Sequence, residues 1–256
     1  MSIKNQSKLN RLLSIAPDGV VLTSSWLLAQ GYSLQLQARY KKSQWFESFG
    51  RGALVRNGDT VDYLGGIQAL QTQLNLSVHP AAKTALVLQG KSHYLEFSTQ
   101  KAQLFSAKSE VLPAWFKKRD WEVKLESSIS SFLPVDLGMV EYQHTSFSIK
   151  ISSPARAIME CLYLAPNEQP LLEVYELMEG LNNIRPITAQ KLLESCSSVK
   201  VKRLFLYMAD KAGHDWLTYV NQDNVDLGKG KRQIVSDGVY IPKYQITVPK
   251  ELETHK

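Results

Sequence analysis

The stretch that most constrains this 256-residue chain runs from Val20 to Arg56. Thr23 or Ser24 can cap a short helix there, because a hydroxyl oxygen accepts a hydrogen bond from an unpaired N–H at a helix start. Gly31 is expected to end this helix, since glycine readily adopts the left-handed conformation of a tight turn. Ser33 provides a second candidate cap, for the next helix. Two short helices joined by a glycine turn predict a helix-turn-helix.

The second helix, expected over residues 34–42, separates two kinds of side chain. Leu36 and Tyr40 lie four residues apart and can pack together on one side. On the other side lie amide and cationic groups, which can read adenine and guanine edges or neutralise phosphates. A small solvated helix shows the same pattern, so both interpretations stay open. The candidate DNA contacts on this helix and its cap are Ser33, Gln35, Arg39, Lys41 and Lys42.

The rotational phase of this helix has two solutions. Lys41 stands where a helix of this kind more often carries an apolar residue. If the helix is turned to expose a different face, Gln37 becomes the amide that faces DNA. Gln37 is therefore kept as an alternative base-reading residue.

A predicted hairpin follows the two helices. Residues 45–49 and 53–56 have the composition of short strands, and Gly50-Arg51-Gly52 can reverse the chain with a cation at the tip. Helix, helix and hairpin in this order predict a winged helix, with Arg51 and Arg56 as candidate contacts to the DNA backbone. Residues 1–80 hold eight Lys or Arg and four Asp or Glu, a net charge of +4 out of +6 for the whole chain. Most of the positive charge thus lies with the motif.

Length and composition predict one large domain or two medium ones. A chain of 256 residues with 44% hydrophobic residues exceeds the usual size of one domain and can form real cores. A boundary is expected where residues 84–95 change to strand-like composition, which gives a winged helix-turn-helix domain over residues 1–90 and a mixed domain over 91–256. The second domain shows candidate strands and helices in mixed order, with a helix capped by Ser152 or Ser153 before Pro154. The predicted fold class is α+β.

The sequence favours a cytoplasmic protein without cofactors. No run approaches the roughly 20 apolar residues that span a bilayer, and the polar first ten residues lack the apolar core of a signal peptide. Cys161 and Cys196 are expected to be buried free thiols. The five histidines have no ligand-like spacing, so no metal site is expected.

No catalytic motif is recognisable. Ser152 and Ser153 lack a G-x-S-x-G elbow and are better explained as helix caps. The run Gly228 to Arg232 fails the spacing of a phosphate-binding loop. The acidic residues of the second half lie on predicted helix surfaces, so the chain is expected not to be an enzyme.

Two basic clusters in the second half form a candidate secondary surface. Either cluster alone is equally consistent with a solvated surface, but together with the basic first domain they suggest a second surface for nucleic acid. The first cluster is Lys200, Lys202 and Arg203, and the second is Lys229, Lys231 and Arg232.

Two motifs of the second half are the most distinctive, the start of the helix at Ser152-Ser153-Pro154-Ala155-Arg156-Ala157 and the segment from Val199 to Phe205. In these motifs the second half resembles the C-terminal domain of the AbiEi family of type IV antitoxins. The remaining matching runs are LGMVEYQHTSFSIKI, ELMEGLNNIRP and DLGKGKRQIVSDGVYIPKYQITVP. The family also places a winged helix with a Gly-Arg-Gly wing before this domain, so the likeness spans nearly the whole chain.

This resemblance implies a DNA-binding antitoxin that represses its own operon. Members bind inverted repeats in double-stranded DNA upstream of their genes and counter a nucleotidyltransferase toxin of the AbiEii kind without forming a stable complex. It implies base reading by Gln35 and Arg39, backbone contacts by Lys41, Lys42, Arg51 and Arg56, and a supporting role for Lys200, Lys202 and Arg203.

Two other hypotheses remain. A stand-alone winged-helix regulator with a ligand-sensing second domain predicts an apolar pocket in that domain. A protein-interaction module predicts that the basic clusters bind an acidic partner.

Overall fold

The computed structural model describes residues 8–91, 101–108 and 110–255, which form two compact units. The first unit combines residues 1–79, 109–124 and 141–150, and the second combines 80–108, 125–140 and 151–256. The chain therefore leaves the first unit after residue 79 and returns to it twice. Both units contain residues from before and after position 90. The domain division predicted between residues 90 and 91 stays a prediction.

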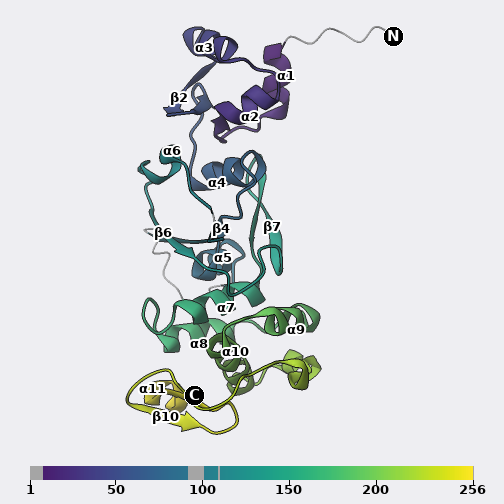
Figure 1. Cartoon of the computed structure of the whole chain (residues 1–256), viewed down its shortest axis with the longest axis vertical. Helices are drawn as coiled ribbons and strands as arrows, with labels where there is room; N and C mark the ends of the chain where they lie inside the picture. Colours follow the sequence, from purple (N-terminus) through teal and green to yellow (C-terminus); the bar gives the residue numbers. More distant parts are fainter. Residues whose placement is uncertain (1–7, 92–100, 109, 256) are drawn as a thin grey trace, which may run out of the picture. The chain divides into compact units, whose positions relative to one another are not determined.

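The N-terminal part of the first unit is a winged helix, as predicted (Figure 1). Its three strands form a sheet in the order β1-β3-β2, and β2 and β3 make the antiparallel wing. Elements follow in the order α1 (Lys8–Ile15), β1 (Leu22–Thr23), α2 (Ser24–Ala29), α3 (Leu34–Lys42), β2 (Phe46–Gly50), β3 (Ala53–Arg56) and α4 (Tyr63–Thr72).

Local capping chemistry explains the helix-turn-helix. The Thr23 hydroxyl accepts a hydrogen bond from the Trp26 N–H at the start of α2. Gly31 has a φ of +84°, and its N–H bonds to the Leu28 carbonyl while the N–H of Tyr32 bonds to that of Leu27. This is the double hydrogen bond that closes a helix on a left-handed residue. The glycine turn predicted from the sequence is thus confirmed.

A returning segment, defined as residues 110–124, adds the short helix α6 (Ala114–Lys117) to the first unit. Its Trp115 packs edge-on against Phe49 of the wing, with ring centroids 6.2 Å apart. Trp121 also contacts Phe49, at 5.6 Å. A Cβ on Gly50 would lie only 2.8 Å from the Cβ of Trp115, so the segment lies directly against β2. The wing is therefore supported by residues some 60 positions later in the chain.

The remaining elements mix helices and three small sheets, which confirms the α+β class. The sheets have the orders β4-β5-β6, β7-β8 and β10-β11-β9. The strands are β4 (His79–Pro80), β5 (Lys101–Ser106), β6 (Lys124–Ile129), β7 (Met139–Gln143), β8 (Ser148–Ser152), β9 (Arg232–Gln233), β10 (Gly238–Ile241) and β11 (Ile246–Pro249). The helices are α5 (Ala82–Leu88), α7 (Pro154–Leu164), α8 (Leu171–Glu179), α9 (Pro186–Ser195), α10 (Val199–Lys211) and α11 (Lys250–Thr254), with short 3₁₀ turns η1 (Asp215–Tyr219) and η2 (Gln222–Asn224).

The strand-like reading of residues 84–95 is wrong over its described first part. Residues 82–88 form α5, and Ala82, Ala85 and Leu86 on its buried face are fully inaccessible. These three positions have helical spacing, and their burial outweighs the strand preference of Thr84 and Val87. Residues 92–100 lie outside the described part of the chain.

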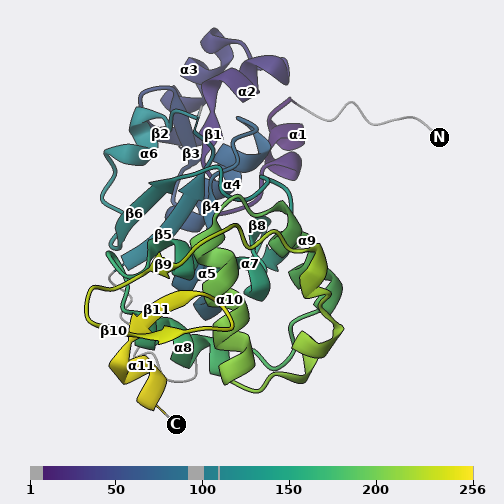
Figure 2. The same cartoon turned by 60° about the horizontal axis from the view of Figure 1, so that its bottom comes forward.

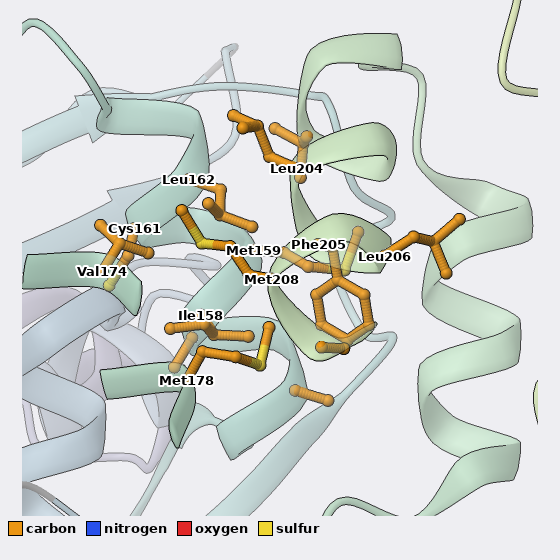
Figure 3. Close-up of a cluster of buried hydrophobic side chains, with 14 of the residues drawn as sticks. Ile158, Met159, Cys161, Leu162, Val174, Met178, Leu204, Phe205, Leu206 and Met208 are labelled. Carbon is orange, nitrogen blue, oxygen red and sulfur yellow. The ribbon is translucent and has the colours of Figure 1, made fainter. Parts of the chain in front are cut away.

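Packing of α7 against α8 and α10 forms the core of the second unit (Figure 3). Met159 and Leu162 of α7 lie beside Leu204 and Met208 of α10 in this view, and Val174 and Met178 of α8 adjoin them. Cys161 belongs to the same core, and both cysteines are free and buried, as expected. Burial raises the pKa of the Cys161 thiol, so this group is held in its unreactive neutral form.

Candidate nucleic-acid interface

The structure fixes the rotational phase of α3. Tyr40 and Gln37 face the core and Leu36 is half-buried. The tyrosine packs on Phe46 of the wing, with ring centroids 6.1 Å apart, and burial raises its pKa. The opposite face is open to solvent and carries Gln35, Ala38, Arg39, Lys41 and Lys42. The amide and cationic stripe predicted from the sequence is therefore on the outside.

Gln37 does not share this face, so the alternative phase is wrong. Its side chain is only 4% exposed, and its amide nitrogen donates to the carbonyl of Tyr32 at 2.8 Å and to that of Ser24 at 3.4 Å. These two carbonyls belong to the turn before α3 and to the start of α2. Gln37 thus ties the helix-turn-helix together, and Lys41 is exposed because the core face is filled by other residues.

We expect Gln37→Ala to reduce the free energy of unfolding by about 1–3 kcal/mol, because the buried carbonyl of Tyr32 and the half-buried carbonyl of Ser24 lose their donor. Gln35→Ala is the matched control on the same helix, and its side chain is exposed, so stability should change by less than about 0.5 kcal/mol. Urea unfolding of both variants measures the difference. Equal stability of the two variants would contradict the structural role of Gln37.

A groove of about 380 Å³ separates α3 from the wing. From α3 it is lined by Leu34, Ala38 and Lys41, and from the wing by Ser48 and Arg51, among others. Leu34 is 61% exposed although it is apolar, and a leucine at this edge suits a thymine methyl group. The sequence pattern missed Leu34, Ala38 and Ser48. Leu34 and Ala38 lie four residues apart on the exposed face of α3. The facing of Ser48 depends on an irregular register between Ser48 and Gly50, which no local pattern indicates.

The two wing arginines have different roles. Arg51 is exposed at the tip, as predicted, next to Gly52, whose φ of +77° makes the turn. Arg56 is not free for DNA as expected, because its guanidinium forms an ion pair with Asp18 and donates to the Ala16 carbonyl at 2.9 Å. It also donates to Leu13 at 3.1 Å. Arg56 therefore anchors the end of α1 to the wing.

Ser33 acts as the cap of α3. Its hydroxyl oxygen accepts a hydrogen bond from the Leu36 N–H at 3.3 Å, while the residue remains exposed. Lys41 and Lys42 follow in the last turn of the same helix, together with Arg39. The cations thus gather at the C-terminal end of α3, where the helix dipole favours positive charge.

The first basic cluster of the second unit is not a surface, contrary to expectation. Lys202 and Arg203 are 4% and 1% exposed. Lys200 is half-buried, donates to the carbonyls of Tyr163 and Ala165 at the end of α7, and has its pKa lowered by burial. Helix α10 is covered on more than one side, because Lys200 reaches the end of α7 and Arg203 reaches a loop at residues 227–230.

Arg203 holds a loop of the second unit. Its guanidinium donates to the carbonyls of Leu227 at 2.8 Å, Gly230 at 2.7 Å and Gln245 at 3.0 Å, and to that of Gly228 at 3.1 Å. Burial lowers the pKa of this guanidinium, and the nearby charge of Arg232 adds to the shift. Arg203 therefore orders the backbone of the glycine-rich loop.

The second basic cluster is exposed. Lys229, Lys231 and Arg232 all face solvent, and the Lys231 ammonium lies 4.8 Å from the centre of the Tyr240 ring. A binding surface at this cluster stays a prediction. Its support is that three exposed cations lie at a loop that Arg203 holds in place.

Charge is distributed unevenly between the units. The first unit contains 13 Lys or Arg and eight Asp or Glu, a net charge of +5, whereas the second contains 17 and 16, a net charge of +1. Electrostatic attraction to a polyanion therefore resides almost wholly in the unit that carries α3 and the wing.

The described residues show no grouping of metal ligands and no membrane-spanning helix. Within residues 8–91, 101–108 and 110–255, no three His, Cys, Asp or Glu side chains group as metal ligands would. The helices of the same ranges are too short or too polar to cross a bilayer. The Ser152 and Ser153 pair, considered above as a catalytic candidate, serves the start of α7: the Ser153 hydroxyl caps it and that of Ser152 donates to Glu160.

Comparison with known proteins concerns the fold and the family. The fold is similar to the crystal structure of the RV2827C protein from Mycobacterium tuberculosis, with a TM-score of 0.54 over 94% of this chain and 89% of that chain. At 12% sequence identity this likeness concerns the fold alone. A search of curated proteins found no significant match.

Two family models match the sequence in succession. Residues 5–97 match the N-terminal domain of the AbiEi antitoxin transcriptional regulators. Residues 99–249 match the family described as transcriptional regulator, AbiEi antitoxin, of the type IV toxin–antitoxin system. These descriptions name a regulator and an antitoxin rather than an enzyme. With both matches covering nearly the whole length, the chain belongs to the AbiEi family of type IV antitoxins.

Proposed function

We propose that this protein represses its own operon by binding inverted repeats upstream of its genes, through α3 and the wing. The observation that carries the proposal is the exposed face of α3, where Gln35, Arg39 and Lys42 stand together while Tyr40 and Gln37 secure the helix from behind. A winged helix places this face in the major groove and its hairpin against the backbone. The protein acts in the cytoplasm and does so without cofactor or catalysis.

Affinity and specificity come from different residues of this interface. Lys41, Lys42 and Arg51 release counterions from phosphates and supply affinity that falls with salt. Arg39 and Gln35 can make bidentate contacts to guanine and adenine, each worth about 1–3 kcal/mol against a wrong base pair. Repression follows by occlusion, since two copies on two half-sites cover promoter DNA.

The first test is titration of the purified protein onto its own upstream DNA and onto a scrambled duplex, at two salt concentrations. Preference for the upstream duplex at the higher salt is the expected result. Equal binding to both, with a steep salt dependence, would reduce the protein to a general phosphate binder and would overturn the proposal.

We expect Arg39→Ala and Lys42→Ala to separate the two contributions. Arg39→Ala should reduce the preference for the upstream duplex about 5- to 150-fold, the range that corresponds to a bidentate base contact. Lys42→Ala should weaken binding to both duplexes nearly equally, because phosphates carry no sequence information. Gel shifts on both duplexes measure the two ratios. If neither variant loses binding, α3 is not the reading helix.

The antitoxin activity is proposed to oppose a nucleotidyltransferase toxin without a stable complex. Its support is the family match, whose description names a type IV system. Co-expression with the neighbouring toxin gene should restore growth, while affinity purification under the same conditions should recover the antitoxin alone. Co-purification of the two proteins in fixed proportion would contradict this mode of action.

A further inference from the structure

The returning segment carries three consecutive cations to the edge of the wing. Residues 117–119 read Lys-Lys-Arg, and all three are exposed. They lie in the first unit although they come about 60 residues after the wing in the sequence. Figure 2 shows α6, which leads into them, beside β2. The positive charge of the first unit therefore comes from this segment as well as from α3 and the wing tip.

The contact between this segment and the wing is firmly built. Trp115 lies against Gly50, the residue before the wing-tip Arg51, at a distance that leaves no room for a side chain on the glycine. The guanidinium of Arg119 covers the Phe49 ring at 4.2 Å from its centre. A cation over an aromatic face is held in place by the negative charge of that face. Arg119 thus fixes the end of α6 to β2, one residue away from Gly50.

A second anchor lies on the other side of the segment. Rings of Phe116 and Trp121 are 5.3 Å apart, and a Cβ on Gly66 of α4 would meet both of them at about 3 Å. The indole N–H of Trp121 donates to the Phe116 carbonyl at 2.8 Å, which closes the segment on itself. The backbone that presents Lys117 and Lys118 is therefore held from β2 and from α4.

Nearby acidic groups do not neutralise the two lysines. Within the described residues, no carboxylate lies within ion-pair distance of Lys117 or Lys118. Asp120 directs an oxygen to the Glu122 N–H at 3.2 Å, so part of its charge is engaged by the backbone. Glu122 of the same segment and Glu47 of β2 are the other exposed acids of this region. The three cations thus equal these acids in number, and Lys117 and Lys118 stay unpaired among the described residues.

We propose that Lys117 and Lys118 contact phosphates of the same duplex that α3 reads, beside the phosphates contacted by Arg51. This inference rests on the proposed function and adds a third element to its interface. Trp115 touches the strand that ends at the wing tip, and Lys118 follows it by three residues, about one helical turn or 5 Å along the axis. The long lysine side chains extend the reach of these positions toward phosphates beside the wing.

The test compares two double variants that remove equal charge. Lys117→Ala/Lys118→Ala removes the proposed contacts, and Lys191→Ala/Lys250→Ala removes two exposed lysines from helices of the second unit. Binding of the full chain to its upstream duplex is measured between 50 and 300 mM salt. Each lost phosphate contact lowers the slope of log K against log salt by about 0.9, so the first variant should lose about 1.8 and the control much less.

Footprinting locates the contact on the DNA. Hydroxyl-radical protection lost in Lys117→Ala/Lys118→Ala should adjoin the protection lost in Arg51→Ala. Unchanged slope and unchanged footprint in the first variant would overturn the inference while leaving operator preference intact. If the unmodified protein shows no preference for its upstream duplex, the proposed function is overturned instead. The slopes of log K against log salt on either duplex would still decide the role of the two lysines.

Discussion

Replacing Arg203 with methionine should lower the free energy of unfolding by about 3–4 kcal/mol and release the loop from Leu227 to Gly230. The guanidinium donates four hydrogen bonds to backbone carbonyls, and hydrogen bonds from a charged donor are worth about 1.5–3 kcal/mol each. Water recovers part of this loss, because Gly228 and Gly230 are exposed on their outer sides. Methionine fills a similar volume but donates nothing.

Urea unfolding measures the stability change, and limited proteolysis measures the order of the loop. Cleavage within residues 227–231 should become faster in Arg203→Met than in the unmodified protein. Lys229→Ala is the matched control, since this exposed side chain lies on the same loop. Its unfolding should shift by less than about 0.5 kcal/mol. An unchanged midpoint for Arg203→Met with a protease-resistant loop would contradict the anchoring role.

Arg203 also explains why the family resemblance was so clear in the second half of the sequence. The two motifs that carried it were residues 152–157 and 199–205, and both contain buried cations. Arg156 pairs with Glu160, and Arg203 binds loop carbonyls. Their side chains fix the architecture of the unit, so these motifs report the fold and say little about a binding surface. A cluster of exposed basic residues of this unit lies instead at the loop that Arg203 holds.

The winged helix could be predicted because its signals are local. Thr23, Gly31 and Ser33 act within three or four residues of themselves, through caps and a left-handed turn. The hairpin likewise closes over two residues. Capping and turn chemistry depend on the backbone alone, so a single sequence is sufficient to reveal them. The exposed face of α3 could be predicted in the same way, because helical spacing puts Arg39 and Lys42 opposite the buried Tyr40.

The missed features depend on distant contacts. Gln37 is buried because carbonyls of Ser24 and Tyr32 accept its amide protons, which no spacing rule indicates. Lys117 and Lys118 join the reading unit because Trp115 fits against Gly50. A basic run at the end of a short helix contains no local signal for the distant residues it will contact. Its place beside the wing is therefore known only from the structure.

The second large effect is expected for Glu160→Gln, which should lower the free energy of unfolding by about 3–5 kcal/mol, since it leaves a buried charge unpaired. One carboxylate oxygen accepts from the Arg156 Nε at 2.8 Å, and the other accepts from the Ser152 hydroxyl at 2.7 Å and the Ala82 N–H at 3.0 Å. All three partners are donors. The amide of glutamine must therefore direct its own N–H₂ at one of them, whichever way it turns.

A double-mutant cycle separates the lost pair from a general disturbance of α7. Arg156→Met and Glu160→Met should each destabilise strongly, while the double variant should lose less than the sum, because no unpaired charge remains. Glu176→Gln on α8 is the exposed control and should change little. Urea unfolding of the set gives the coupling energy directly. Strict additivity would show that Arg156 and Glu160 act independently, with Arg156 held mainly by the carbonyls of Pro134 and Leu137, each at 2.6 Å. A large coupling energy would show that the ion pair itself stabilises the second unit, where Glu160 also joins α7 to the start of α5 through the Ala82 N–H.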